Sequence, residues 1–425
     1  MLAATIAKVR RRLIPFLFLL YIVSYLDRIN VGFAALQMNA ALGLSATAYG
    51  YGAGIFFLSY TLFEVPSSVI LARVGARLWI ARIMITWGVV SSAMMFARSP
   101  LHFYVLRFLL GAAEAGFFPG IIFYLTEWFP SRERARTIAA FMTAVLVAGI
   151  IGGPLSGAIL TMHGVGGLAG WQWLFLLEGV PAVVLGFVVL VYLSERPEDA
   201  TWLSPEERGV LVAALKQDAI ERGASTRTVA DALRSGRVWL LAIVYFTIPV
   251  VLYAFGFWLP QIMKEASNGS DLEVGFLTAI PYLVGAIGMV VVARHSDRTN
   301  ERRWHIVLSA MVGGVAFALS ASVHTLGGSL VTLSIAMLGL AAMFGPFWAL
   351  ASASLGGAGA ATGIALINSV GNTGGFLGPY LLGAVRDATG SFAWGLVAIG
   401  ILFALVPLLV MAVREPTNSI PRRLV

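Results

Sequence analysis

The sequence predicts an all-α membrane protein with twelve transmembrane helices arranged as two pseudo-symmetric six-helix bundles. The 425 residues are 59% hydrophobic and only 12% charged, with a mean hydropathy of +0.85, whereas about a quarter of the residues in a soluble domain are charged. Apolar runs of roughly 20 residues, enough to cross a hydrocarbon core of about 30 Å, recur along the chain. One long polar stretch, 195–237, divides these runs into two groups.

Hydropathy locates the ends of the spans to within several residues. We predict spans at 13–34, 46–72, 79–98, 102–127, 136–160, 171–194, 238–262, 272–294, 304–324, 328–353, 358–381 and 391–414. The first six form an N-terminal bundle within residues 1–194, and the last six form a C-terminal bundle within residues 238–425. The stretch 195–237 is the linker. It contains residues that resemble a capped surface helix: Pro197, Glu198, Asp199, Ser204, Pro205, Glu206, Glu207 and Arg208.

The Lys and Arg residues lie mainly in alternate loops, which predicts the orientation because basic residues are retained on the cytoplasmic side. The basic loops contain Lys8, Arg10, Arg11 and Arg12; Arg73 and Arg77; Arg132, Arg134 and Arg136; the seven basic residues of the linker; Arg294, Arg298, Arg302 and Arg303; and Arg414, Arg422 and Arg423. The other loops contain only Arg98, Lys264 and Arg386. Both termini are therefore expected in the cytoplasm, and the net charge of +8 reflects this topology and not a surface for nucleic acid.

The two halves resemble each other in corresponding spans, as parallel repeats do. Residues 73–79, after the second span, resemble residues 294–304, after the eighth. Gly-Gly-Pro at 152–154 in the fifth span matches Gly-Gly at 374–375 in the eleventh, with Pro379 shortly after. Together these matches favour an internal duplication.

Several kinds of chemistry are excluded by what the sequence lacks. With no cysteine, the chain forms no disulfide, thiolate metal site or iron–sulfur cluster. It has no Gly-x-x-x-x-Gly-Lys-Ser/Thr loop, so it lacks the nucleotide-binding motif that an ATP-driven pump needs. The histidines lie singly at span ends, without the spacing of a metal site: His102, His163, His295, His305 and His324. We therefore expect no enzyme activity, no cofactor and no metal.

Ionisable side chains inside the spans indicate a pathway for a polar ligand, because a charge at mid-bilayer costs about 2.5 to 3.5 kcal/mol on insertion scales. Asp27 and Arg28 lie well inside the first span, and Arg107 and Glu114 lie two turns apart on one face of the fourth. Two cations and two carboxylates are suited to bind an organic anion and carry a proton, because a desolvated carboxylate holds its proton tightly and a nearby arginine weakens that hold. Structural ion pairs are the alternative, and this alternative is favoured for Glu64, Glu127 and Glu178.

The second half offers a polar and aromatic wall with little charge. Asn368 and Asn372 are four residues apart in the eleventh span, and a hydroxylated ligand would satisfy their amides. Hydrogen bonding between helices is the alternative for both. Trp348 in the tenth span and Tyr245 in the seventh belong to the same wall, with ordinary packing or an interfacial anchor as the alternative for Trp348.

Four segments resemble the anion:cation symporter family of the major facilitator superfamily. They are Tyr25-Leu26-Asp27-Arg28-Ile29-Asn30, the stretch from Arg107 to Gly116, Trp202-Leu203-Ser204-Pro205-Glu206-Glu207-Arg208 and the stretch from Asn368 to Pro379. The resemblance covers most of the chain. It implies the major facilitator fold and proton-driven uptake of organic anions by alternating access.

The resemblance also implies roles for residues at matching positions. Asp27 and Glu114 match positions that take part in proton coupling. The positions that contact the anion or shape its site match Arg28, Arg107, Tyr60, Trp348 and Asn368, with Tyr25 adjacent. Asn372 and Tyr245 are added from their place in the wall. Tyr245 rests on that place alone, because the seventh span matches the family less clearly.

The expected activity is symport of protons with a small organic anion, either a hydroxy-dicarboxylate such as tartrate or a sugar acid, by a monomer in the bacterial inner membrane. Aromatic carboxylates of the phthalate or hydroxyphenylacetate type, and exchange of organic anions, remain open. A drug exporter would favour cationic or neutral cargo, which two buried arginines disfavour. An organophosphate antiporter would run without a pH gradient, and a membrane sensor would bind its ligand without transporting it.

Overall fold

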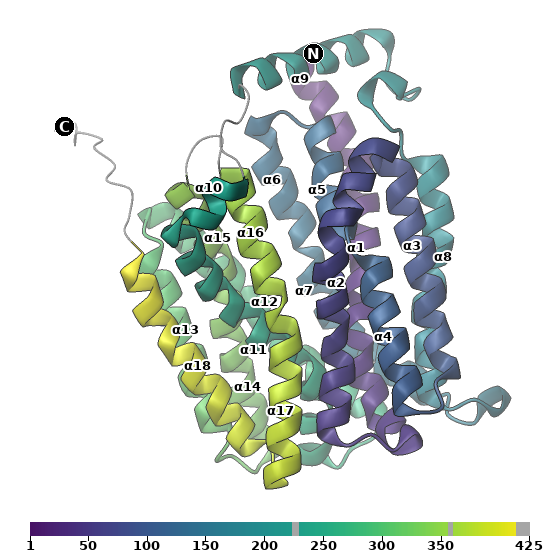
Figure 1. Ribbon diagram of the computed structural model, residues 1–425, viewed down its shortest axis with the longest axis vertical. Coiled ribbons are helices and arrows are strands. Elements are labelled where there is room, and N and C mark those ends of the chain that lie inside the picture. The colour runs from purple at the N-terminus through teal and green to yellow at the C-terminus, as the bar shows by residue number, and fades with distance from the viewer. Residues whose placement is uncertain (223–228, 356–359, 414–425) are drawn as a thin grey trace.

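The computed structural model describes residues 1–222, 229–355 and 360–413, and these residues are almost entirely helical (Figure 1). Ten helical rods among them are long and apolar enough to cross a membrane. These rods are α1 (Leu2–Leu42), α2 (Ala46–Val74), α3 (Ala76–Ala93), α4 (Pro100–Glu114) with α5 (Phe117–Trp128), α8 (Gly170–Tyr192), α11 (Gly236–Ser267), α12 (Asp271–Thr299), α13 (Arg303–Ser320), α14 (Leu326–Ala342) with α15 (Phe344–Leu355), and α18 (Ala393–Ala412).

Two further rods complete a set of twelve. They are α6 (Ser131–Met142) with α7 (Ala144–Leu160), and α16 (Ala360–Asn372) with α17 (Gly374–Thr389). The prediction of an all-α membrane protein with twelve spans is therefore confirmed. The first span is longer than predicted, because the helix begins at Leu2, well before the apolar run at 13–34.

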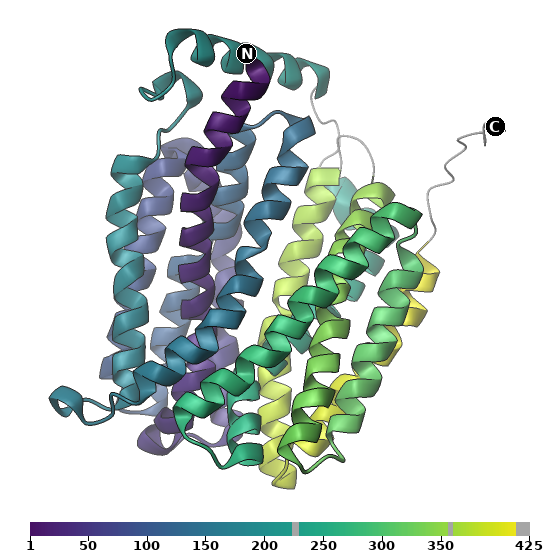
Figure 2. The same ribbon diagram turned by 180° about the vertical axis from the view of Figure 1, so that it is seen from behind.

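The rods form two halves that stand side by side, with α1 to α8 in one and α11 to α18 in the other (Figures 1 and 2). In each half the fourth and fifth rods are broken. The breaks lie at Ala115 and Gly116, at Thr143, at Met343 and at Thr373. The same irregularity at equivalent places supports the duplication that the sequence matches predicted, whereas the boundaries 1–194, 195–237 and 238–425 stay a prediction.

The linker contributes a surface helix, α9 (Pro205–Arg222), and a short helix, α10 (Val229–Arg234), at the end of the molecule that also holds the N-terminus (Figure 1). We call this the linker end. Ser204 N donates to the Glu207 carboxylate over 2.9 Å, and Glu207 N donates to Ser204 Oγ over 3.1 Å. This reciprocal pair confirms the predicted helix cap, and Lys8 holds the helix to α1 by an ion pair with Glu207 of 2.7 Å.

At the opposite end the two halves meet backbone to backbone, where α2 packs along α17 and α7 along α12. A Cβ atom on Gly50 would overlap the backbone of Pro379, and one on Gly153 would overlap the backbone of Gly275. The Asp387 carboxylate of α17 accepts hydrogen bonds from the first N–H groups of α2, which closes the same end from the other half. The halves are therefore sealed at the end away from the linker.

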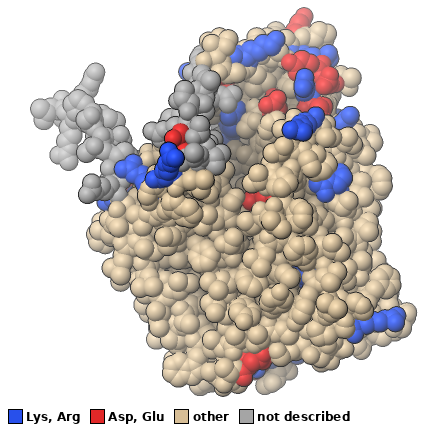
Figure 3. Space-filling model, viewed as in Figure 1, with Lys and Arg blue, Asp and Glu red and all other residues tan. Residues whose placement is uncertain are grey.

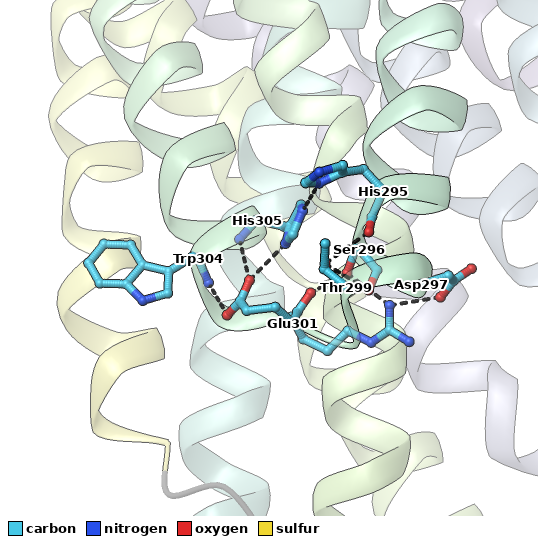
Figure 4. Close-up of polar contacts among 8 residues, drawn as sticks. His295, Ser296, Asp297, Thr299, Glu301, Trp304 and His305 are labelled. Carbon is cyan, nitrogen blue, oxygen red and sulfur yellow. Dashed lines mark hydrogen bonds and ion pairs between the residues drawn. The ribbon is translucent and has the colours of Figure 1, made fainter. Parts of the chain in front are cut away.

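A glutamate caps the start of the third rod in both halves. The Glu195 carboxylate accepts from two successive N–H groups at the start of α3, and the Glu301 carboxylate accepts from those of Trp304 and His305 at the start of α13. Figure 4 shows that His305 also links Glu301 to His295, with 2.7 Å between His305 Nδ1 and Glu301 Oε2 and 2.7 Å between His305 Nε2 and His295 Nδ1. The expectation that the histidines lie singly is wrong here, because a tight loop folds α13 back beside α12. No group of three ligands suited to a metal occurs among the described residues.

The Glu301 cap should make stability depend on pH. Burial raises the pKa of Glu301, but hydrogen bonds donated by the backbone of Trp304 and by the backbone and ring of His305 outweigh it and hold the pKa below its ordinary value. A lowered pKa stabilises the folded protein at pH values above the ordinary glutamate pKa of about 4.3. This stabilisation is lost as the pH falls through the lowered pKa. We expect Glu301→Gln to lower the melting temperature of the purified protein by about 1 °C at pH 7. The deficit should shrink as the pH falls through the lowered pKa of Glu301 and vanish at more acidic pH; an equal deficit at pH 7 and at acidic pH would contradict the role of the charge.

Candidate functional site

An ion pair lies in the middle of the membrane-spanning region. The Arg28 guanidinium of α1 pairs with the Glu114 carboxylate of α4, whose Oε1 also accepts from Ser24 Oγ over 3.0 Å. Arg28 donates in addition to the Tyr253 hydroxyl of α11 over 3.3 Å. Because α11 belongs to the other half, this network spans the interface between the halves.

A break in the fourth rod places Glu114. α4 ends at Glu114, and Gly116, the N-cap of α5, has a φ of 89°, a conformation that favours glycine. The carbonyl of Ala115 at the break accepts from Ser67 Oγ of α2 over 2.6 Å. The carboxylate that pairs with Arg28 therefore stands at the end of a half-helix.

Arg107 is fully buried, yet most of its donors lack partners. Its Nη2 donates to the carbonyl of Ala53 over 2.9 Å, while Nε and Nη1 have no hydrogen-bond partner. Its guanidinium lies 4.9 Å from the ring centre of Phe56 and 6.0 Å from that of Phe257 in α11. No carboxylate among the described residues forms an ion pair with it. A buried cation with unpaired donors is costly, so this position favours an anionic ligand.

Asp27 precedes Arg28 but belongs to a different set of contacts. One step along an α-helix turns the side chain by about 100°, and Asp27 faces α3, where it accepts a hydrogen bond from Ser91 Oγ. It also accepts one from Asn30 Nδ2 of its own helix. It is only 1% exposed, and its Oδ2 has no partner. The two predicted proton-coupling carboxylates are thus in separate networks, with Glu114 at the interface and Asp27 inside the first half.

Aromatic side chains of the second half gather beside the interface. The Tyr245 ring centre lies 4.7 Å from that of Trp348 and 5.2 Å from that of Phe347. Gly371 of α16 lies against the Tyr245 ring, and a Cβ there would overlap it. Tyr245, Trp348 and Phe347 therefore form one aromatic cluster, and its role as a wall of the substrate site stays a prediction.

The two predicted amides lie beside this wall on α16. Asn368 and Asn372 are partly exposed, and neither side chain hydrogen-bonds to a described residue. Ser369, between them, donates to Glu64 Oε2 of α2 over 3.2 Å. Sequence reasoning missed this contact, because it treated Glu64 as structural.

Tyr60 and Tyr25 differ in their relation to the central ion pair. The Arg28 guanidinium lies 5.4 Å from the ring centre of Tyr60, so Tyr60 packs directly against the predicted anion site. Tyr25 is buried with Leu26, Ile29 and Ala148 in a small apolar cluster between α1 and α7. It is near the site along the chain but faces apolar neighbours.

The surface matches a protein embedded in lipid. Figure 3 shows charged side chains gathered toward the two ends of the molecule, with an almost uncharged belt between them. A hollow opens between the halves toward the linker end (Figure 3). A separate cleft of about 460 Å³ lies at the linker end near Arg73 and Glu195, away from the central ion pair.

Comparison with known proteins identifies the fold. The family model of the Major Facilitator Superfamily matches residues 17–379. The chain belongs to the Major Facilitator Superfamily. This facilitator has the architecture of a bacterial homologue of the human lysosomal transporter Spinster, with a TM-score of 0.79 at 18% identity over 96% of this chain and 99% of that one. The family resemblance predicted from the motifs is confirmed.

Relatives of this facilitator are transport proteins. It is 48% identical over 422 residues to a protein of Agrobacterium vitis named "Putative tartrate transporter", which covers 99% of this chain and 94% of the relative. It is 42% identical over 398 residues to the "Quinolone resistance transporter" of Acinetobacter baumannii, covering 93% of this chain and 92% of the relative. The protein is therefore a multi-pass membrane transporter and not an enzyme, as predicted. The roles of the individual site residues stay predictions.

Proposed function

We propose that this facilitator is a proton-coupled symporter that takes up a small hydroxylated organic anion, such as tartrate or a sugar acid, by alternating access. The observation that carries the proposal is Arg107, a fully buried guanidinium with two unpaired nitrogens beside the interface of the halves. A carboxylate of the substrate would supply the missing acceptor and charge. The relatives named for tartrate support a carboxylate of this kind.

The ion pair of Arg28 and Glu114 would couple proton transfer to anion binding. A proton taken up by Glu114 cancels its charge, breaks the ion pair and frees Arg28 to bind the anion. Loss of that proton on the other side restores the pair, which displaces the anion from Arg28. Asp27, with an unpaired buried oxygen, is the second group suited to carry a proton.

The basic loops lie at the linker end, and we take this end as cytoplasmic in a bacterial inner membrane. The sealed end then faces outward, and the hollow between the halves opens inward (Figure 3). Rocking of the halves about the central ion pair would open the seal and close the hollow. The proton gradient drives this cycle without a cofactor, and one chain suffices because both walls of the site belong to it.

Aromatic carboxylates are the second candidate cargo. The wall of Tyr245, Trp348 and Phe347 offers ring contacts, and the relative named for quinolone resistance suggests an aromatic substrate. Exchange of one anion for another is the alternative to symport. A transport assay with the purified protein separates both alternatives from the leading proposal.

Purified protein in proteoliposomes should accumulate tartrate when the outside is acidic. We expect uphill uptake with a pH gradient, collapse of the accumulated pool by a protonophore, and acidification of the lumen that accompanies tartrate uptake. Phthalate and other aromatic acids should compete weakly. Preference for phthalate would favour the aromatic alternative, and transport that requires an internal anion but ignores the pH gradient would identify an exchanger. Absence of flux with any hydroxy acid would refute the proposal.

A further inference from the structure

A third buried carboxylate, Glu64, lies next to the central ion pair. It is four residues beyond Tyr60 on α2, about one turn or 6 Å along the axis, and the Tyr60 ring packs against the Arg28 guanidinium. Glu64 is 6% exposed. It is therefore at the edge of the predicted anion site, on the side toward the linker end.

The partners of Glu64 do not neutralise its charge. Oε2 accepts a hydrogen bond from Ser369 Oγ, but no Lys or Arg among the described residues forms an ion pair with Glu64. Oε1 has no hydrogen-bond donor in the described part of the chain and is not buried. Glu114, by comparison, pairs with Arg28. A carboxylate that is almost buried and has one neutral donor leaves room for a donor from a ligand.

The opposite wall at this level is neutral and polar. Ser369 stands between Asn368 and Asn372, whose amides hydrogen-bond to no described residue. The cations Arg28 and Arg107 are associated with Phe56, two turns of α2 before Glu64. Arg28 also lies 5.4 Å from the ring centre of Tyr60, one turn before Glu64. The site therefore changes from cationic near Phe56 and Tyr60 to hydrogen-bonding near Glu64, which forms no ion pair with a described residue.

We propose that Glu64 accepts a hydrogen bond from a hydroxyl group of the substrate and so selects hydroxylated acids over acids of the same size without hydroxyls. This inference rests on the proposed function and names the chemical class that its site takes. A second carboxylate of the substrate would be repelled by Glu64. A bare methylene or an aromatic ring would leave the Glu64 carboxylate oxygen without a hydrogen-bond donor. A hydroxyl group satisfies the oxygen without adding charge.

The test compares tartrate with succinate, which has the same four-carbon dicarboxylate frame but no hydroxyls. Binding to purified wild type, Glu64→Gln and Ser369→Ala is measured by titration calorimetry, and competition is measured against labelled tartrate uptake. We expect Glu64→Gln to weaken tartrate binding about tenfold or more, while succinate binding stays the same or improves. Ser369→Ala keeps the acceptor and should retain the preference for tartrate. Glu127→Gln, the same change at an exposed carboxylate of α5, is the matched control.

The outcomes separate this inference from the proposed function. If wild type binds no hydroxy acid, the proposed function itself fails. If wild type binds tartrate but Glu64→Gln weakens tartrate and succinate equally, the inference fails and the proposed function stands. The inference fails in the same way if Glu64→Gln changes only the pH dependence of uptake, because Glu64 would then bind a proton and not a hydroxyl group of the substrate. Glu64→Asp, which keeps the charge, should preserve the preference for tartrate if the first variant does not fold.

Discussion

Replacing Arg107 by methionine should abolish concentrative tartrate uptake without lowering the stability of the protein. The substitution keeps a long side chain to fill the space but removes a buried cation whose Nε and Nη1 have no partners. Losing a charge-assisted contact with the anion should reduce kcat/KM by about 100-fold or more. The melting temperature without ligand should stay the same or rise, because an unpaired buried charge is itself destabilising. The measurements are uptake in proteoliposomes and thermal unfolding in detergent.

The thermal unfolding measurement distinguishes a role of Arg107 in ligand binding from a structural role. An arginine that holds helices together would lower the melting temperature when replaced, whereas a ligand-binding arginine would not. Arg107→Lys should recover little activity, because an ammonium group cannot make the bidentate contacts of a guanidinium. Arg98→Met, at an exposed position, is the control. Normal uptake by Arg107→Met would remove Arg107 from the anion site.

Glu114→Gln should separate exchange from accumulation. The amide keeps the shape of the side chain but never takes up or releases a proton, so Arg28 is freed permanently from its ion pair. Counterflow, in which internal tartrate exchanges with labelled external tartrate, should continue at a rate within about tenfold of wild type. Uphill uptake driven by a pH gradient should disappear. Both are measured in the same proteoliposomes.

A parallel change at Asp27 refines this result. Asp27 is in the separate network with Ser91 and Asn30, so Asp27→Asn leaves the pair of Arg28 and Glu114 intact. If Glu114 alone is the coupling group, Asp27→Asn still accumulates tartrate. Loss of accumulation in both variants would assign coupling to both carboxylates. Retained accumulation in Glu114→Gln would exclude Glu114 from coupling.

Much of the architecture could be predicted from sequence because lipid imposes simple rules. Span length and apolar composition predicted twelve rods, and the polar residues between Pro197 and Arg208 predicted the capped surface helix α9. Both signals are local in the chain. Buried charges also stand out against an apolar background, so Arg28, Arg107 and Glu114 were recognisable from the sequence alone.

The pairing of these charges could not be predicted, because it depends on how the rods are rotated against one another. Arg107 and Glu114 share one face of α4, yet Glu114 pairs with Arg28 of α1 and Arg107 contacts a carbonyl of α2. Glu64 was interpreted as structural from its place just before Pro66, and its contact with Ser369 could not be predicted because Ser369 lies 305 residues further along the chain.

The backbone contacts at the sealed end have a consequence for the proton gradient across the membrane. Protons cross membranes along chains of hydrogen-bonded water, and a chain needs room for each molecule. Where Gly50 meets Pro379 and Gly153 meets Gly275, the helices leave no space even for a methyl group. At these two contacts the closed interface therefore leaves no room for a chain of water molecules. A bulkier residue at Gly50 or Gly153 would hold the helices apart and admit water, and the resulting leak would dissipate the gradient that a symporter uses.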